Sequence, residues 1–128
     1  MSLKRLAAML ATTVALGTPF AVASPASADS CSSGHACYYY LTNYKSYSFG
    51  DSHGITNFKS FHFGNGASLN DNVESVRGST YALVVLYQNA GFTGIHKAIN
   101  VDSKLSTLGN FNDIASSSAF FCVGANTC

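Results

Sequence analysis

Two short segments of the chain carry oxygen-bearing side chains in the same order, 42 residues apart. They are Asn70-Asp71-Asn72-Val73-Glu74-Ser75 and Asn112-Asp113-Ile114-Ala115-Ser116-Ser117. Ca²⁺ prefers about six to eight oxygen ligands, drawn from carboxylates, hydroxyls and backbone carbonyls. The candidate calcium ligands, through side chains or carbonyls, are Asp71, Asn72, Glu74, Asp113, Ile114 and Ser116. The alternative is that both segments only form turns, since Asn, Asp and Ser side chains often bond to nearby backbone groups.

Cysteines flank these segments on both sides, with Cys31 and Cys37 ahead of them and Cys122 and Cys128 behind. An even number of cysteines in a short chain is typical of a disulfide framework. Two local loops compete with pairings that join the chain ends, so three connectivities are open. Zinc bound by Cys31, His35 and Cys37 is disfavoured, because a structural zinc site needs four ligands at tighter spacing.

The chain has the residue types of a hydrolase without the motifs that would organise them. Its histidines lack a Glu-x-x-His or similar metal-binding spacing, and no serine lies in a nucleophile elbow. We therefore predict that the protein is not an enzyme. The four scattered histidines are His35, His53, His62 and His96.

An aromatic motif precedes each Asn-Asp segment and shows which elements would position it. Tyr87, Phe92 and Gly94 are spaced as in a folded-over hairpin, and 48 positions earlier Tyr39, Tyr44 and Ser46 occupy the same places. The chain therefore contains two related halves, each with room for about four short strands. The predicted strands are Ala36–Leu41, Ser60–Phe63, Val73–Arg77, Tyr81–Tyr87, Gly94–Ile99 and Ile114–Phe121. We predict an all-β sandwich of two Greek keys, at about 36–79 and 80–123.

The N-terminus has the layout of an export signal. Lys4 and Arg5 precede an apolar run from 6 to 23, and Ala26-Ser27-Ala28 provides a cleavage site. We predict a signal peptide at 1–28, a secreted domain at 29–128, and no membrane attachment after cleavage. That domain has five basic and six acidic residues, a net charge of −1, which argues against a nucleic-acid partner.

Tyr87–Gly94 resembles the aromatic hairpin motif of βγ-crystallins, and Asn112–Ser117 resembles their calcium motif. The export signal and the segment Cys31–Cys37, followed by tyrosines, resemble the secreted Streptomyces metalloproteinase inhibitor family. The resemblance implies that the two halves exchange calcium ligands, with Ser116 and Asp71 in one site. It also implies that the other site is altered, because Glu74 stands where Ser or Thr is usual.

The same resemblance implies an inhibitor of an extracellular protease, and we expect the protein to be a monomer. In that family the reactive bond is a Cys-Val pair in a small cysteine loop, which points to Cys122 and Val123 here. It also favours local disulfides, Cys31 with Cys37 and Cys122 with Cys128. The alternative function is a calcium-binding module without a protease target, either a structural or stress protein or a killer-toxin-like antimicrobial.

Overall fold

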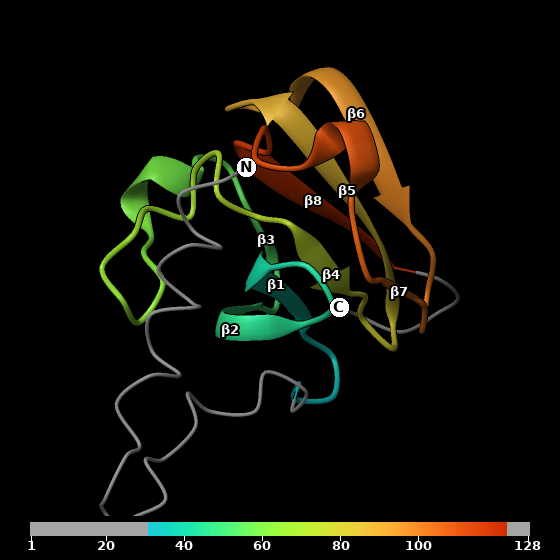
Figure 1. Ribbon diagram of the computed structural model, residues 1–128. Coiled ribbons are helices and arrows are strands. Elements are labelled where there is room, and N and C mark those ends of the chain that lie inside the picture. The colour runs from blue at the N-terminus through green and yellow to red at the C-terminus, as the bar shows by residue number, and fades with distance from the viewer. Residues whose placement is uncertain (1–30, 123–128) are drawn as a thin grey trace, which may run out of the picture.

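The computed structural model describes residues 31–122, and these residues form two antiparallel sheets that enclose an apolar core (Figure 1). Helix in this part of the chain is limited to two 3-10 turns, η1 (Phe58–Ser60) and η2 (Gly109–Phe111). No helix among the described residues is long and apolar enough to cross a membrane. The strands are β1 (Ala36–Leu41), β2 (Lys45–Asp51), β3 (Gly54–Ile55), β4 (Ser75–Arg77), β5 (Ala82–Asn89), β6 (Thr93–Ile99), β7 (Lys104–Leu105) and β8 (Ser117–Cys122).

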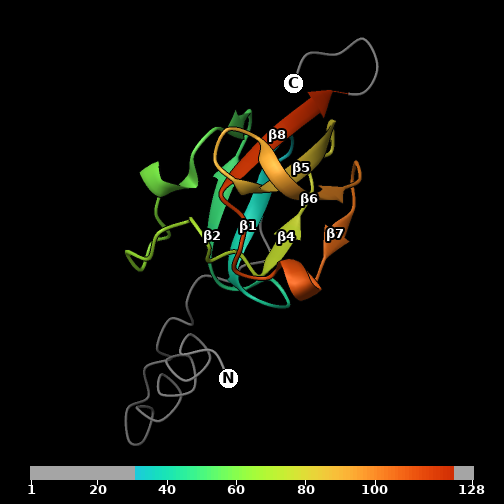
Figure 2. The same cartoon turned by 90° about the horizontal axis from the view of Figure 1, so that it is seen from above.

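Each sheet contains three strands from one half of the chain and one strand from the other half. The first sheet has the order β2-β1-β4-β7, which can be followed in Figure 2, and the second has the order β3-β8-β5-β6. Strand β3 therefore leaves the first half to pair with β8, while β7 leaves the second half to pair with β4. The predicted all-β, two-sheet sandwich is confirmed.

Alternation of side chains along the strands explains the core. Tyr38 on β1, Val76 on β4, and Val84 and Leu86 on β5 all point inward and are fully buried. Residues two apart on a strand share a face, so the intervening positions point outward. The Tyr38 ring packs on Phe58 of η1, with ring centroids 5.5 Å apart, which ties the turn region to the sheet.

One buried carboxylate joins the two sheets. Asp51, at the end of β2, is 4% exposed and accepts hydrogen bonds from the Tyr38 hydroxyl (2.6 Å) and the Ser118 hydroxyl (2.7 Å). Its other oxygen accepts from the backbone N–H groups of His53 and Gly54, at 3.1 and 2.8 Å. Four donors thus replace the water that the carboxylate loses on burial.

Five of the six predicted strands have counterparts, Ala36–Leu41 with the same ends as β1 and the other four with shifted ends, whereas the predicted strand at Ser60–Phe63 is wrong. Ser60 ends η1, and in the following loop His62 forms an isolated bridge with Ser68. The Asn57 side chain accepts from the Lys59 N–H and caps the turn, and Phe58 and Phe63 are buried without a strand while Phe61 stays exposed. The structure also adds β2, β3 and β7, which the sequence patterns did not predict.

Candidate functional site

The two Asn-Asp segments lie against each other and exchange equivalent hydrogen bonds. The Asp71 N–H donates to the Ala115 carbonyl (2.9 Å), and the Asp113 N–H donates to the Val73 carbonyl (3.0 Å). Both aspartates have left-handed backbones, with φ of 58° and 63°. Asp adopts this conformation more readily than most residues, which explains its place in both copies. The two segments, which are related in sequence, therefore also form equivalent hydrogen bonds in the structure.

The last serine of each segment fixes the aromatic hairpin of its own half. Ser75 Oγ donates to the Leu41 carbonyl (2.6 Å) and accepts from the Tyr44 N–H (3.0 Å). In the second half Ser117 Oγ donates to the Asn89 carbonyl (2.7 Å) and accepts from the Phe92 N–H (3.1 Å). These two serines therefore have a structural role, because each hydroxyl is used both as donor and as acceptor.

A pocket of about 470 Å³ opens where the two Asn-Asp segments meet the second hairpin. In it, the Ser116 hydroxyl donates to Asp71 Oδ1 (3.3 Å) and the Asn70 amide donates to Asp71 Oδ2 (2.9 Å). An aspartate of the first half and a serine of the second thus share one site. The pocket is lined by Asn57, Lys59, Asn70, Asp71, Gln88, Asn89, Ala90, Asp113, Ile114 and Ser116.

Four of the six candidate calcium ligands line this pocket, and two do not. Asn72 is absent from the lining, and its side-chain amide donates to the Ser68 carbonyl (2.8 Å). Glu74 is also absent and is only 1% exposed. The six lining residues that were not among the candidate ligands are Asn57, Lys59, Asn70, Gln88, Asn89 and Ala90. The signal for Gln88 and Asn89 was their place inside the aromatic hairpin motif.

The equivalent region of the first half has a different chemistry. Tyr40 occupies the position of Gln88, and Glu74 that of Ser116. Burial, followed by the nearby charges of Asp113 and Glu74, raises the pKa of Tyr40. The Tyr40 ring also packs edge-on against Phe63, with centroids 5.5 Å apart. Bulkier side chains thus replace the amide and hydroxyl of the second half, and the two regions are not equivalent.

The described part of the chain contains no group of three or more His, Cys, Asp or Glu side chains arranged to hold a metal ion. Any cation in the pocket would need hydroxyl, amide and carbonyl oxygens to complete its shell. Such mixed oxygen sets are suitable for Ca²⁺ and unsuitable for soft transition metals.

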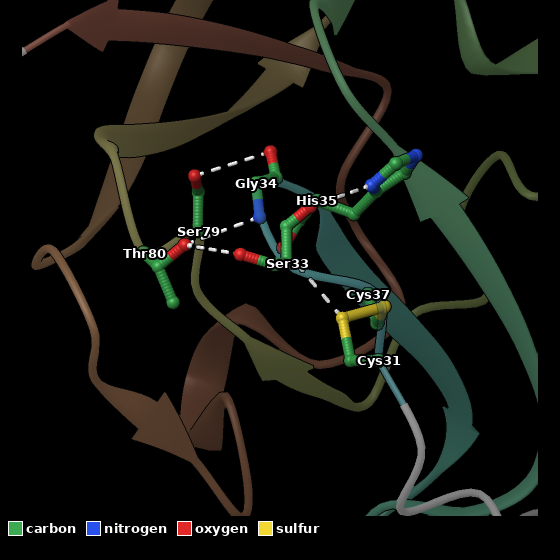
Figure 3. The surroundings of a disulfide bond; sticks show 7 residues. All are labelled: Cys31, Ser33, Gly34, His35, Cys37, Ser79 and Thr80. Atoms are coloured by element: carbon green, nitrogen blue, oxygen red, sulfur yellow. Dashed lines mark hydrogen bonds between the residues drawn. A yellow bond between two sulfur atoms is a disulfide. The ribbon is translucent and has the colours of Figure 1, made fainter.

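One predicted disulfide is present at the start of the described residues. Cys31 and Cys37 are bonded, with Cα atoms 5.9 Å apart (Figure 3). The Gly34 N–H donates to Thr80 Oγ1 (3.1 Å), and Ser79 Oγ donates to the Gly34 carbonyl (3.2 Å), so the loop is attached to the chain before β5. Cys128 and Val123 lie outside the described residues, so the second predicted disulfide and the predicted reactive bond remain predictions.

A family model described as peptidase inhibitor family I36 matches residues 24–99. The chain belongs to this family. The match confirms the resemblance to the Streptomyces metalloproteinase inhibitor family, and membership points to an inhibitor rather than an enzyme. A comparison with curated proteins finds no significant sequence relative.

The fold is that of βγ-crystallin domains. A structure from work on the evolution of the eye lens βγ-crystallin domain fold matches with a TM-score of 0.66 and 22% identity, over 74% of this chain and 93% of the other. A βγ-crystallin domain from Flavobacterium johnsoniae matches with a TM-score of 0.58 and 27% identity, over 71% and 98%. The N-terminal domain of Protein S matches with a TM-score of 0.59 and 21% identity, over 71% and 99%.

Proposed function

We propose that the chain is exported and inhibits an extracellular metalloproteinase through the segment that begins at Cys122 and Val123. The observation that carries this proposal is membership of the peptidase inhibitor family. The predicted export signal at 1–28 and the Cys31–Cys37 disulfide support secretion, because disulfides persist in oxidising compartments.

The proposed inhibitory segment begins at the paired end of β8. Cys122 is directly opposite Ala82 on β5, and Phe121 is opposite Leu83. Ala82 is fully buried, whereas Phe121 is 50% exposed. Strand pairing therefore holds Cys122, the first residue of the proposed inhibitory segment, in a fixed position at the edge of the core.

The loop closed by Cys31 and Cys37 is less suitable for insertion into a protease cleft. The His35 N–H donates to the Ser32 carbonyl (3.0 Å) within a tight turn. Both backbone groups of Gly34 are bonded to the 79–80 segment. A peptide recognised by strand addition needs extended backbone with available N–H and carbonyl groups. These contacts support the C-terminal segment, rather than this loop, as the proposed inhibitory contact.

Residual-activity assays of secreted metalloproteinases and serine proteinases, titrated with the mature chain, test this proposal. We expect inhibition of a metalloproteinase that Val123→Asp abolishes without lowering the melting temperature. The matched control is Ser32→Asp, which adds the same charge to the exposed N-terminal disulfide loop and should leave inhibition unchanged. Failure to inhibit any protease, or loss of inhibition by the control alone, would contradict the proposal.

A second candidate function is calcium binding at the pocket that contains Asp71 and Ser116. It is supported by the pairing of these two side chains across the halves, and by the neighbouring oxygens of Asn57, Gln88 and Ile114. A carboxylate, a hydroxyl and uncharged oxygens form a chemically suitable set for Ca²⁺. Lys59 also lines the pocket, and its positive charge opposes cation binding. In the first half, Glu74 and Tyr40 occupy the equivalent positions, so we propose one calcium site.

Thermal unfolding with calcium or with a chelator tests this second function. Binding to the folded state alone stabilises it by about 2.7 kcal/mol at a hundredfold excess over Kd, or on the order of 10 °C in melting temperature. Asp71→Asn should reduce this gain, Lys59→Gln should increase it, and magnesium should produce less. Asp102→Asn is the matched control, because Asp102 also has a left-handed backbone (φ 56°) and does not line this pocket. An equal melting temperature with calcium and with chelator would show that the segments form turns only.

A further inference from the structure

One asparagine of the chain is followed by glycine, and this pair, Asn65-Gly66, lies in the loop between η1 and β4. Both residues are exposed. Apart from the neighbours of Gly66 in the chain, no atom lies within 4 Å of the position that a Cβ would take there. Asparagine is among the least durable residues of a protein. Its side-chain carbonyl carbon can be attacked by the next backbone nitrogen, and a glycine nitrogen is the least hindered because glycine has no Cβ.

A hydrogen bond to the side-chain oxygen of Asn65 prepares its amide for this attack. The Ala67 N–H donates to Asn65 Oδ1 (3.0 Å). This bond spans the Gly66 peptide, so the side-chain carbonyl is held within the same turn as the Gly66 nitrogen. Attack on the carbonyl carbon moves negative charge onto Oδ1, and a backbone N–H donor that is already in place stabilises that charge.

One contact opposes the reaction, and it lies in an exposed turn. The Gly66 N–H donates to the Phe63 carbonyl (2.9 Å), and this hydrogen bond must break before the nitrogen can attack. Gly64, Asn65 and Gly66 are all exposed. Backbone segments with few buried contacts and exposed hydrogen bonds open locally at a low cost in free energy. The hydrogen bond therefore slows the reaction without preventing it.

A second asparagine, Asn57, shares the side-chain hydrogen bond but not the glycine. Its Oδ1 accepts from the Lys59 N–H at the same distance, 3.0 Å, and Asn57 is also exposed. It is followed by Phe58, which is fully buried and whose N–H donates to the Ser116 carbonyl (2.9 Å). This nitrogen is shielded by a Cβ and is anchored to the core. The two asparagines therefore differ mainly in the nitrogen that follows them.

We propose that Asn65 is a site of spontaneous deamidation in the folded protein. The Gly66 nitrogen forms a bond to Asn65 Cγ, the bond from Cγ to the side-chain nitrogen breaks, and the proton of the Gly66 nitrogen leaves with that group as ammonia. Water then opens the cyclic imide at either of its carbonyls and gives aspartate or isoaspartate. Each product adds one negative charge to the mature domain, whose net charge is −1.

Isoaspartate changes the loop more than aspartate does, because it adds a methylene group to the backbone. The Phe63 N–H donates to the Ala67 carbonyl (2.9 Å), which closes the loop around residue 65. Phe63 is buried and packs against Tyr40, with ring centroids 5.5 Å apart. A longer backbone between Phe63 and Ala67 disturbs this hydrogen bond, so we expect the isoaspartate form to melt at a lower temperature than the aspartate form. The proposal is independent of protease inhibition.

Incubation of the folded mature chain at mildly alkaline pH, followed by trypsin digestion and mass spectrometry, tests the site. Trypsin cuts after Lys59 and Arg77, so Asn57 and Asn65 fall in different peptides. We expect the peptide 60–77 to gain the mass difference between an amide and an acid, and its fragmentation to place the change at Asn65. Asn65 should convert about tenfold faster than Asn57 or more, a difference of about 1.4 kcal/mol in the activation barrier.

Three variants complete the test. Gly66→Ala should slow the conversion by about the same factor, because a Cβ then shields the nitrogen. Asn65→Gln should stop it over the same period, because the longer side chain would have to close a larger ring. Asn65→Asp provides the melting temperature of the aspartate product. Equal conversion of Asn57 and Asn65 in the folded chain would overturn the proposal, and so would conversion of Asn65 that occurs only in urea.

Discussion

Ser46→Gly should stabilise the protein, because Ser46 has a backbone conformation that suits glycine. Its φ is 69°, and the equivalent residue of the second half is Gly94, with φ of 85°. A residue with a Cβ loses roughly 1–2 kcal/mol in the left-handed region. Glycine gains flexibility in the unfolded chain, which offsets about 0.4–1 kcal/mol of that benefit. We expect a net gain of about 1 kcal/mol in the free energy of unfolding, or roughly 4–8 °C in melting temperature.

Urea unfolding followed by circular dichroism measures this gain, with the reverse substitution as a comparison. Gly94→Ser should lose more than Ser46→Gly gains, because a Cβ at Gly94 would also be 2.8 Å from the Asn89 side-chain nitrogen. Gly66→Ala isolates the backbone cost, since φ is 84° there and no atom lies within 4 Å of the added Cβ. A Ser46→Gly variant no more stable than the parent would refute the reasoning, provided that Gly66→Ala is destabilised as expected.

Three further predictions concern the core and the N-terminal loop. Burial first, then the charge of Asp51 and the hydrogen bond to it, raise the pKa of Tyr38 well above 10.0. Below pH 10 the tyrosine is neutral in both states, while above it only the unfolded state loses the proton, so the free energy of unfolding should fall by up to about 1.4 kcal/mol per pH unit. Urea unfolding across pH 9 to about 11 measures this slope, which Tyr38→Phe should reduce. Asp51→Ala removes the acceptor of four hydrogen bonds and should cost about 3 kcal/mol or more; a loss below about 1 kcal/mol would contradict its role in joining the sheets. Replacing Cys31 and Cys37 with serine should cost about 2 kcal/mol, measured against the parent under non-reducing conditions.

The parts of the fold that repeat in sequence were predictable, and the parts that depend on single tertiary contacts were not. The doubled aromatic motif correctly placed β1 and the β5–β6 hairpin. Strands β3 and β7 have two residues each, too few to show any alternation of apolar and polar residues. Strand β2 alternates weakly because it is at the edge of its sheet and most of its residues are exposed or half-buried.

The candidate site likewise has a part that the sequence predicted and a part that it did not. The repeat and the resemblance together predicted that Asp71 and Ser116 share a site, since each is at a fixed place in its own copy. Lys59 enters the same pocket from η1, a segment whose counterpart η2 has Gly109 at the equivalent place. No sequence motif links these two turns. The sequence therefore did not predict that the positive charge of Lys59 lies beside the candidate calcium ligands.

The exchange of β3 and β7 between the sheets has a consequence for how the protein unfolds. Neither half of the chain contains all the strands of one sheet, because each sheet is completed by two residues from the other half. A half that separated would expose the core residues Val76 and Val84 and leave a sheet edge unpaired. The halves should therefore melt in one cooperative transition, and a break in the chain between β4 and β5 should give two fragments that fold only when mixed.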